Sequence, residues 1–174
     1  MSKPTPEELV KKTIDGAYRL ALRLTGNSSD AWDLTQEALL KAIEALPGFR
    51  GDASPSTWVY RIVVNLWKNQ RQSLAGRFWS RLFSFESERG FVEPTSAEPA
   101  PDQAAEDAAR RAAFDSALAE LAPEDRAALV LRELDAKSYE EISEILGVPM
   151  GTVKSRLHRA RMTLARLWEK EHGA

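Results

Sequence analysis

The most informative segment of the chain reads GVPMGTVKSRLHRARMTL and covers residues 147–164. The chain as a whole is slightly acidic, with a formal net charge of −2 at pH 7, yet no Asp or Glu lies between residues 144 and 169. That interval contains five cationic side chains, Lys154, Arg156, Arg159, Arg161 and Arg166. At helical spacing it also contains one apolar stripe, formed by Val153, Leu157, Ala160, Leu164 and Leu167. A helix here would pack through one face and present positive charge on the rest.

A short helix and a tight turn are predicted just before this basic helix. Ser138 and Glu141 have the spacing of a capping box, in which each side chain accepts a hydrogen bond from the other residue's backbone N–H. The helix that they begin is expected to end at Leu146, before a turn at Gly147. Two helices joined by a short turn that contains Gly form a helix-turn-helix motif, whose second helix enters the major groove of DNA.

The outward face of the second helix is therefore predicted to bind duplex DNA. Clustered Lys and Arg gain affinity for the phosphate backbone by releasing its condensed counterions. The alternative interpretation, a basic helix that is merely solvated, is weakened by the lack of acidic residues among the cations. We expect DNA contacts from Thr152, Lys154, Ser155, Arg156, His158, Arg159 and Arg161.

Composition restricts the possible chemistry. The 174 residues include no cysteine and two histidines, so thiolate metal sites are excluded and no metal-ligand spacing is found. A Gly-rich phosphate loop is also missing. No apolar run approaches the roughly 20 residues that span a bilayer, and the N-terminus lacks the apolar core of a signal peptide. We expect a cytoplasmic protein that is neither an enzyme nor itself a membrane protein, without cofactor, metal or small-molecule substrate.

The expected fold is all-α, with two small helical domains joined by a flexible linker. Thr5 and Glu8 have the spacing of a capping box with proline at the first helical position, and Ser54-Pro55 is a similar helix start. No stretch alternates like a strand. Behind the first start, five apolar residues fall on one helical face: Val10, Ile14, Ala17, Ala21 and Leu24. Residues 76–125 carry 11 acidic and 5 basic side chains, and three prolines lie between positions 94 and 101. This is linker composition. We place the domains at residues 1–75 and 105–174, with the acidic linker at 76–104.

A second group of side chains is predicted on the helix expected from Ser56 to Gln72. Its apolar pattern assigns Val59, Ile62, Val63 and Leu66 to the core. The other face would carry Trp58, Arg61, Asn65 and Lys68. An indole, two cations and an amide can stack on a base, pair with phosphate and hydrogen-bond a base edge, as proteins that bind single strands do. The residue types alone do not decide between binding of a single strand and a simple role for the Trp58 indole in the core.

Two stretches resemble a known family. They are AYRLALRLTGNSSDAWDLTQEALLKAIEALPGFRGDASPSTWVYRIVVN, residues 17–65, and LAPEDRAALVLRELDAKSYEEISEILGVPMGTVKSRLHRARMTL, residues 121–164. In this order and spacing they are similar to bacterial RNA polymerase sigma factors of the extracytoplasmic-function (ECF) group, in the sigma-70 family. One departure is Ser143, which stands where the helix-turn-helix of the family usually has alanine.

The resemblance implies a subunit that binds core RNA polymerase, directs promoter-specific initiation and helps melt DNA. It implies no small-molecule substrate, and it implies control by an anti-sigma factor. It implies that the C-terminal domain reads the minus-thirty-five element, with Arg156 and Arg161 on phosphates. The N-terminal domain would contact polymerase through Asp33, Gln36 and Glu37. It would read the minus-ten element and the melted non-template strand through Phe49, Arg50, Gly51, Asp52, Trp58, Arg61, Asn65 and Lys68.

Two rival interpretations remain at this point. A stand-alone helix-turn-helix regulator would bind duplex DNA and use its first half to sense a signal. A helical enzyme or scaffold would bind no DNA at all. The face that carries Trp58 and Asn65 separates the first rival from a sigma factor, because a protein that reads only duplex DNA has no use for it.

Overall fold

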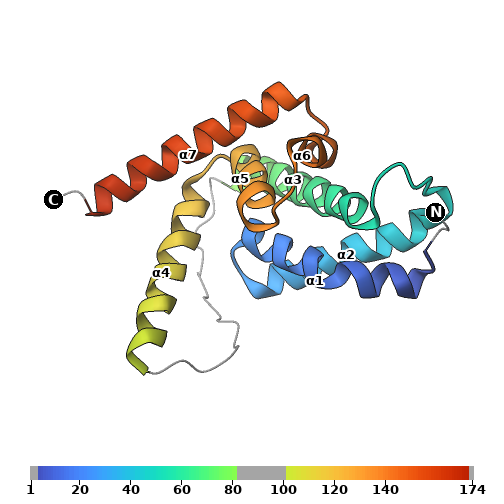
Figure 1. Ribbon diagram of the computed structural model, residues 1–174, viewed down its shortest axis with the longest axis horizontal. Coiled ribbons are helices and arrows are strands. Elements are labelled where there is room, and N and C mark those ends of the chain that lie inside the picture. Colours follow the sequence, from blue (N-terminus) through green and yellow to red (C-terminus); the bar gives the residue numbers. More distant parts are fainter. Residues whose placement is uncertain (1–3, 82–100, 173–174) are drawn as a thin grey trace. The chain divides into compact units, whose positions relative to one another are not determined.

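The structure is a computed structural model that describes the backbone of residues 4–81 and 101–172, and the side chains of 4–71 and 110–170 apart from 111. Within these residues every regular element is helical and there is no strand, which confirms the all-α expectation (Figure 1). The elements are α1 (Pro6–Thr25), α2 (Ser28–Ala45), the 3₁₀ turn η1 (Leu46–Gly48), α3 (Pro55–Arg81), α4 (Pro101–Glu120), α5 (Pro123–Leu129), the π-helical turn η2 (Val130–Leu134), α6 (Tyr139–Leu146) and α7 (Met150–His172).

The described elements form two compact units. One unit contains α1, α2 and α3, and the other contains α4, α5, η2, α7 and α6 as far as Ser143. Helix α3 continues to Arg81, past the domain boundary expected at residue 75, and α4 begins at Pro101, before the expected end of the linker at 104. Most of that linker, residues 82–100, lies outside the described residues. The domain boundaries stay predictions.

Helix α1 begins at the predicted capping box. The backbone N–H of Thr5 donates to Glu8 Oε2 at 2.9 Å, and the Glu8 N–H donates to Thr5 Oγ1 at 3.2 Å. The buried stripe of α1 is Leu9, Thr13, Ala17, Leu20, Ala21 and Leu24. Val10 and Ile14, expected at its centre, lie half-buried at its edge. Thr13 is tolerated in the core because its hydroxyl donates to the Leu9 carbonyl at 2.8 Å.

Helices α1, α2 and α3 pack against one another (Figure 1). Helix α2 buries six positions, three of them alanines, and these small side chains let the helix axes approach closely: Ala31, Leu34, Thr35, Ala38, Leu39 and Ala42. Helix α3 fills the remaining space with larger ones: Val59, Tyr60, Val63, Val64 and Trp67. Ile62 and Leu66, which the apolar pattern assigned to the core, are half-buried. The wide buried face of α3 leaves a narrow outward face for other contacts.

In the second unit, α5 packs against α7 (Figure 1). Ala127, Ala128 and Leu131 are fully buried on one side of this unit, and Val153, Leu157 and Ala160 are buried along α7. Leu164 and Leu167, the remaining members of the predicted stripe, are half-buried. The apolar stripe of α7 is thus covered over its first three turns, and its burial orients the basic face outward.

The turn between α6 and α7 is held by short-range hydrogen bonds. Helix α6 begins at the predicted capping box, with Ser138 N–H donating to Glu141 Oε2 at 2.9 Å and Glu141 N–H donating to Ser138 Oγ at 3.1 Å. The Ser143 hydroxyl donates to the Val148 carbonyl at 2.6 Å, and the Val148 N–H donates to the Ser143 carbonyl at 3.1 Å. Ser143 therefore ties both ends of the turn, which an alanine at this position could do only through its backbone.

The close packing of α1 on α3 yields a stability prediction. A Cβ on Gly16 would lie 2.5 Å from the Tyr60 hydroxyl and 3.2 Å from its ring, and Tyr60 is buried. Gly16→Ala should lower the free energy of unfolding by about 1–2 kcal/mol in chemical denaturation followed by circular dichroism. Ala in a helix otherwise stabilises by about 1 kcal/mol relative to Gly, so the overlap must exceed that gain.

Two variants isolate the overlap. Gly151→Ala in α7 is the matched control, because no atom of the described residues beyond its own helix lies within 4 Å of that Cβ, and it should be neutral or stabilising. Adding Tyr60→Phe to Gly16→Ala should recover part of the loss when compared with Tyr60→Phe alone. Equal effects of Gly16→Ala and Gly151→Ala would refute the overlap.

The turn yields a second prediction. Gly147 has φ +64°, and apart from its chain neighbours nothing in the described part of the chain lies within 4 Å of the place of a Cβ. Gly147→Ala should therefore destabilise the protein by about 1 kcal/mol through backbone conformation alone. Gly147→Asn should be less destabilising, because Asn adopts this conformation more readily. Thermal unfolding of the two variants checks the order, and a reversed order contradicts it.

Candidate nucleic-acid interface

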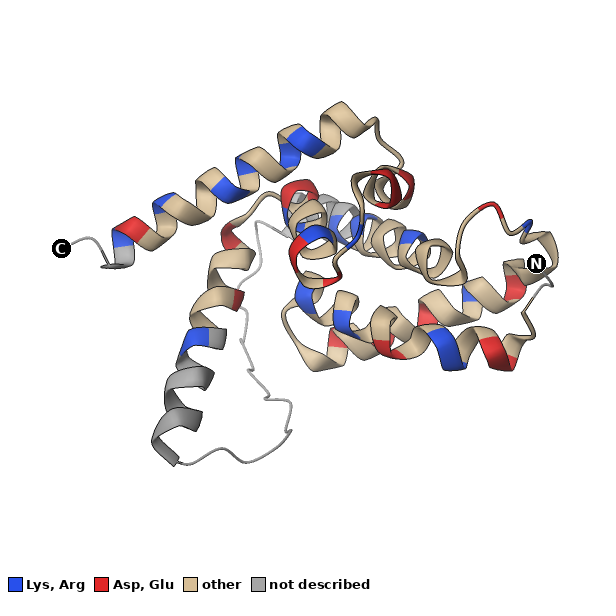
Figure 2. Ribbon diagram, viewed as in Figure 1, with Lys and Arg blue, Asp and Glu red and all other residues tan. Residues whose placement is uncertain are grey.

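The candidate DNA-binding residues lie along the exposed side of α7. Figure 2 shows basic residues recurring along this helix. Five of the predicted side chains are exposed, Lys154, Ser155, His158, Arg159 and Arg161, and two are half-buried, Thr152 and Arg156. The Ser155 hydroxyl donates to the Gly151 carbonyl at 2.7 Å. Its oxygen can still accept a hydrogen bond in this position. The prediction that these residues share one helix and reach solvent fits the structure, and their contacts with DNA stay predictions.

Arg159 is engaged by a carboxylate from another helix. Its Nε donates to Asp125 Oδ2 at 3.0 Å and its Nη2 donates to Asp125 Oδ1 at 2.8 Å, a two-point pair. The Asp125 side chain is 9% exposed, whereas that of Arg159 is 58% exposed. The hydrogen bonds to Asp125, and then its charge, raise the pKa of Arg159 above its usual range. The pair links α5 to the recognition face of α7.

Arg161 is paired less tightly. Its Nη2 donates to Glu133 Oε1 at 2.6 Å, and both side chains are about half exposed, at 52% and 47%. This hydrogen bond raises the pKa of Arg161. Arg156 differs from both, because its Nη1 is buried and lacks a hydrogen-bond partner among the described residues.

Lys154 lies in an electrostatic environment shared with α6. The pKa of Glu140 is lowered, first by a hydrogen bond from its backbone N–H and next by one from Ser138. Lys154 and Arg132 make smaller contributions through their charge. Arg132 itself lies 5.0 Å from the centre of the Tyr139 ring and donates to the Lys137 carbonyl at 2.8 Å. Acidic side chains therefore border the basic face of α7 without interrupting it.

The first unit combines a loop and a helix into one aromatic surface. The Phe49 and Trp58 rings lie 4.8 Å apart at 37°, and both are half-buried. Gly51, with φ +81°, turns the loop, and Arg50 Nε lies 3.3 Å from Asp52 Oδ2. That ion pair is 85% and 78% exposed, so it contributes little to stability.

The outward face of α3 continues from this aromatic pair. Arg61 and Asn65 are exposed, one and two turns after Trp58, and Lys68 is half-buried. The half-buried rings can stack on an unpaired base, and the exposed amide two turns along the helix can hydrogen-bond a base edge. The cations can contact the phosphates of the same strand. The four α3 residues predicted on one face do share it, and the structure adds Phe49 as a ring partner of Trp58.

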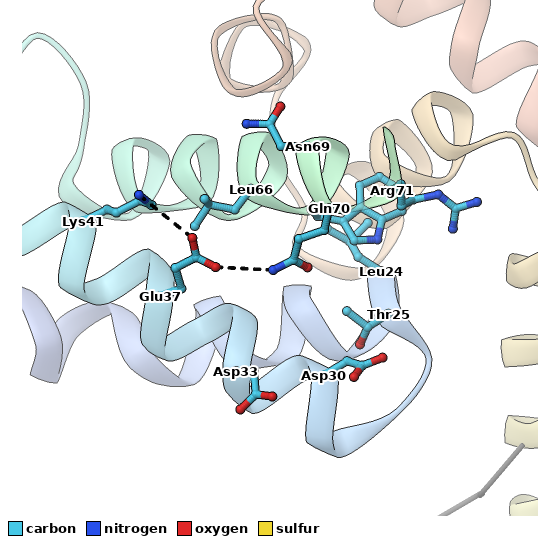
Figure 3. Close-up of a pocket in the computed structure, with 11 residues that line it drawn as sticks. Leu24, Thr25, Asp30, Asp33, Glu37, Lys41, Leu66, Asn69, Gln70 and Arg71 are labelled. Atoms are coloured by element: carbon cyan, nitrogen blue, oxygen red, sulfur yellow. Dashed lines mark hydrogen bonds and ion pairs between the residues drawn. The ribbon is translucent and has the colours of Figure 1, made fainter. Parts of the chain in front are cut away.

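A cavity of about 660 Å³ lies in the first unit where α2 faces α3 (Figure 3). Asp33 and Glu37 line it from α2, and Gln70 lines it from α3. Glu37 accepts a hydrogen bond from Gln70 Nε2 at 3.4 Å and lies 3.9 Å from Lys41 Nζ. Asp33 and Glu37, two of the predicted polymerase contacts, thus form part of an acidic wall.

Apolar side chains border the acidic residues of α2. Trp32 is 46% exposed and Leu40 is 62% exposed. They lie on α2 with the exposed Gln36 between them, at i, i+4 and i+8, so the three share one stripe. The Trp32 ring is partly supported by Tyr18, with centroids 4.9 Å apart. Exposed aromatic and aliphatic residues beside charged ones are characteristic of protein interfaces.

Sequence reasoning missed four of these residues. Asp125 and Glu133 lie 34 and 28 positions from their arginine partners, and no local pattern connects them. Trp32 and Leu40 could have been found, because two large apolar side chains at helical spacing on the polar side of α2 are unusual for a solvated face.

None of the helices in the described part of the chain combines the length and the apolar character that a membrane span requires. The same residues contain no group of three or more His, Asp or Glu side chains placed to hold a metal ion.

Family models match both halves of the chain. The model described as sigma-70 region 2 matches residues 9–77, and the model described as sigma-70, region 4 matches residues 111–164. The first match contains the three-helix unit up to most of α3. The second contains the helix-turn-helix and the acidic partners of its arginines.

Curated relatives extend this similarity. The ECF RNA polymerase sigma-E factor of Escherichia coli K12 is 41% identical over 141 residues, which cover 77% of this chain and 71% of the relative. The ECF RNA polymerase sigma factor SigE of Mycolicibacterium smegmatis is 38% identical over 164 residues, which cover 92% of this chain. The chain spans 60% of the length of that mycobacterial protein.

Solved structures share the fold. The sigma factor RpoE of Bartonella quintana, determined in complex with the anti-sigma factor NepR, matches with a TM-score of 0.75 at 24% identity, covering 94% of this chain and 96% of that one. CnrH, determined in complex with the cytosolic domain of CnrY, matches with a TM-score of 0.64 at 24% identity, covering 95% and 88%.

Proposed function

The chain belongs to the ECF group of RNA polymerase sigma factors in the sigma-70 family, and on this basis we propose that it gives core RNA polymerase its promoter specificity. It binds core polymerase, reads an upstream and a start-proximal promoter element, and helps separate the DNA strands. The protein contributes binding surfaces and no catalytic group. It acts in the cytoplasm, where polymerase and promoter DNA are present.

One observation carries this proposal beyond a duplex-binding regulator. The Phe49 and Trp58 rings, 4.8 Å apart, lie on the same unit as the exposed Asn65 amide and Arg61 guanidinium. Stacking on aromatic rings is useful only for a base that has left the duplex, and taking a base out of the stack requires a few kcal/mol that such a surface offsets. A stand-alone regulator that reads closed duplex DNA would not need it.

The upstream, minus-thirty-five element is read by α7. Its apolar stripe is buried, so Lys154, Ser155 and His158 project away from the unit at successive positions of the outward face. Arg156 is half-buried at the side of this outward face, where its guanidinium would contact a phosphate. Phosphate contacts fix the helix in the major groove, and base contacts supply sequence preference.

Core polymerase binds the exposed side of α2. The stripe formed by Trp32, Gln36 and Leu40 supplies apolar area, and the neighbouring Asp33 and Glu37 supply negative charge beside a cavity. Such a surface suits a basic and partly apolar helical segment of the partner. An anti-sigma factor, such as the one bound to the Bartonella relative, would hold the protein inactive until a signal releases it.

Reconstituted transcription tests the function directly. Purified core polymerase, with and without this protein, is incubated with fragments of the source genome, and the transcript starts are sequenced. We expect starts that depend on the protein and share two elements, one near minus ten and one near minus thirty-five. Specific duplex binding without any dependent start would favour the stand-alone regulator instead.

The polymerase contact yields a prediction for α2. Asp33→Arg should weaken binding to core polymerase by at least about tenfold, because a like charge would face a basic partner. Asp15→Arg on α1 is the matched control, since Asp15 is also exposed and its replacement changes the net charge equally. Competition binding with a labelled wild-type protein measures both affinities. Equal affinities of the two variants would remove Asp33 from the interface.

The strand-opening role yields a prediction for α3. Asn65→Ala should reduce the fraction of open complexes by about three- to tenfold, because a hydrogen bond to an unpaired base is lost. Asn69→Ala, one turn later on the cavity side of α3, should leave that fraction unchanged at saturating polymerase. Permanganate reactivity of thymines in the melted region gives the fraction. Wild-type reactivity in Asn65→Ala would contradict the assignment.

A further inference from the structure

On the basis of the DNA contact proposed for α7, we infer that Asp125 is a positioning residue for base reading. It holds the Arg159 guanidinium by one edge, so that the adjacent end is offered to a guanine in the major groove. Asp125 lies in α5, outside the helix-turn-helix, and it does not itself touch DNA in this arrangement.

Asp125 uses only two of the hydrogen-bond donors of the Arg159 guanidinium. Arg has five N–H donors in a planar fork, and Asp125 accepts from Nε at 3.0 Å and from Nη2 at 2.8 Å. Three N–H donors remain, two on Nη1 and one on Nη2. Two of them, one on each Nη, point in the same direction along the end of the guanidinium next to the edge that Asp125 holds, and the Arg159 side chain is 58% exposed. That end is a complete two-point donor.

Asp125 is a rigid support for this arrangement. Its side chain is 9% exposed, and α5, which carries it, packs directly against α7. A carboxylate buried to this degree is strongly unfavourable without a partner, so Arg159 does not leave it readily. The hydrogen bonds to Asp125 also raise the pKa of Arg159, which is charged under all relevant conditions. The orientation of the guanidinium is therefore set before DNA arrives.

Pre-positioning changes what Arg159 can recognise. Guanine presents two acceptors, O6 and N7, to the major groove, and a two-point Arg donor matches them, whereas adenine presents one acceptor and one donor. A mobile arginine can turn to a phosphate instead and then carries no base information. With one edge held, less side-chain entropy is lost on binding and fewer alternative contacts are available.

Arg161 provides the internal comparison. Its Nη2 makes one hydrogen bond with Glu133 at 2.6 Å, and both side chains are about half exposed. A solvated pair of this kind opens at little cost, so Arg161 can exchange its carboxylate for a phosphate. Similar charges on one helix thus serve different purposes because their acidic partners differ in burial and geometry.

The experiment uses the full chain assembled with core polymerase. The wild-type assembly first selects its preferred upstream element from random duplexes, and affinities are then measured for that element, for every single base-pair change in it, and for scrambled duplex. Arg159→Ala identifies the base pair that Arg159 reads, as the position where a change no longer matters. We expect a G·C pair there, preferred by the wild type by about tenfold or more.

Asp125→Asn should reduce the preference at that one pair to about twofold, while preferences at the other pairs stay within about twofold of wild type. Affinity for scrambled duplex should be unchanged or higher, because an anionic group beside α7 is removed. Glu133→Gln, the matched control at the second ion pair, should leave all base preferences unchanged. Arg159→Lys leaves the buried carboxylate with a cationic partner and should lose the same single preference. It checks the base that Arg159 reads. Asp125→Glu keeps the negative charge but displaces the carboxylate, so it should also lose the preference and tests the positioning if Asp125→Asn folds poorly.

Three results would overturn the inference. In the first, the Asp125 variant retains the wild-type preference at the pair that Arg159→Ala identifies. In the second, it weakens all positions equally, which would make the ion pair a stabilising contact only. In the third, Arg159→Ala weakens every duplex alike, which would assign Arg159 to phosphate. If the wild-type assembly selects no upstream element at all, the proposed reading of DNA by α7 fails too. That result differs from the three above, in which an element is selected and only the role of Asp125 or Arg159 fails.

Discussion

The packing of α7 on α5 is the constraint on which the second unit depends. Val153, Leu157 and Ala160 are buried along one line of α7, so the opposite line must face outward. The same contact brings Asp125 of α5 within hydrogen-bond distance of Arg159. Burial of apolar surface drives the packing of α7 on α5. That packing does not depend on the ion pair, and it sets the orientation of the pair. Core packing and the orientation of the Arg159 guanidinium are therefore two consequences of one helix pair.

In the first unit, too, the packing of the helices determines which side chains face outward. Small residues of α1 and α2 let these helices approach closely, and the larger residues of α3, among them Tyr60 and Trp67, fill the space beside them. Because α3 buries so much of its surface, its polar and charged residues gather on one narrow face. Phe49 then extends that face by packing on Trp58. A surface suited to unpaired bases arises where a well-filled helix meets a loop that a glycine turns sharply.

Local chemistry was predictable from the sequence, and long-range pairing was not. The capping boxes at Thr5 and Ser138 form as expected, because each depends only on residues three positions apart. On α1, Ala17, Ala21 and Leu24 are buried as predicted, whereas Leu9 is buried in place of Val10, because both are apolar and only the neighbouring helices choose between them. Five of the seven candidate residues on α7 are exposed, and Thr152 and Arg156 are half-buried. The acidic partners of Arg159 and Arg161 could not be predicted, because they depend on how α5 lies on α7.

These partners change how the charge of α7 should be understood. Arg159 and Arg161 are each paired with a carboxylate, so the face carries less uncompensated charge than its sequence suggests. Non-specific affinity for DNA grows with the number of phosphates neutralised, and a paired arginine contributes less to it. A sigma factor that must find few promoters among many other sites benefits from that reduction, because specificity is a ratio of affinities. Acidic residues beside a DNA-binding helix can therefore sharpen recognition by lowering the affinity that every sequence shares.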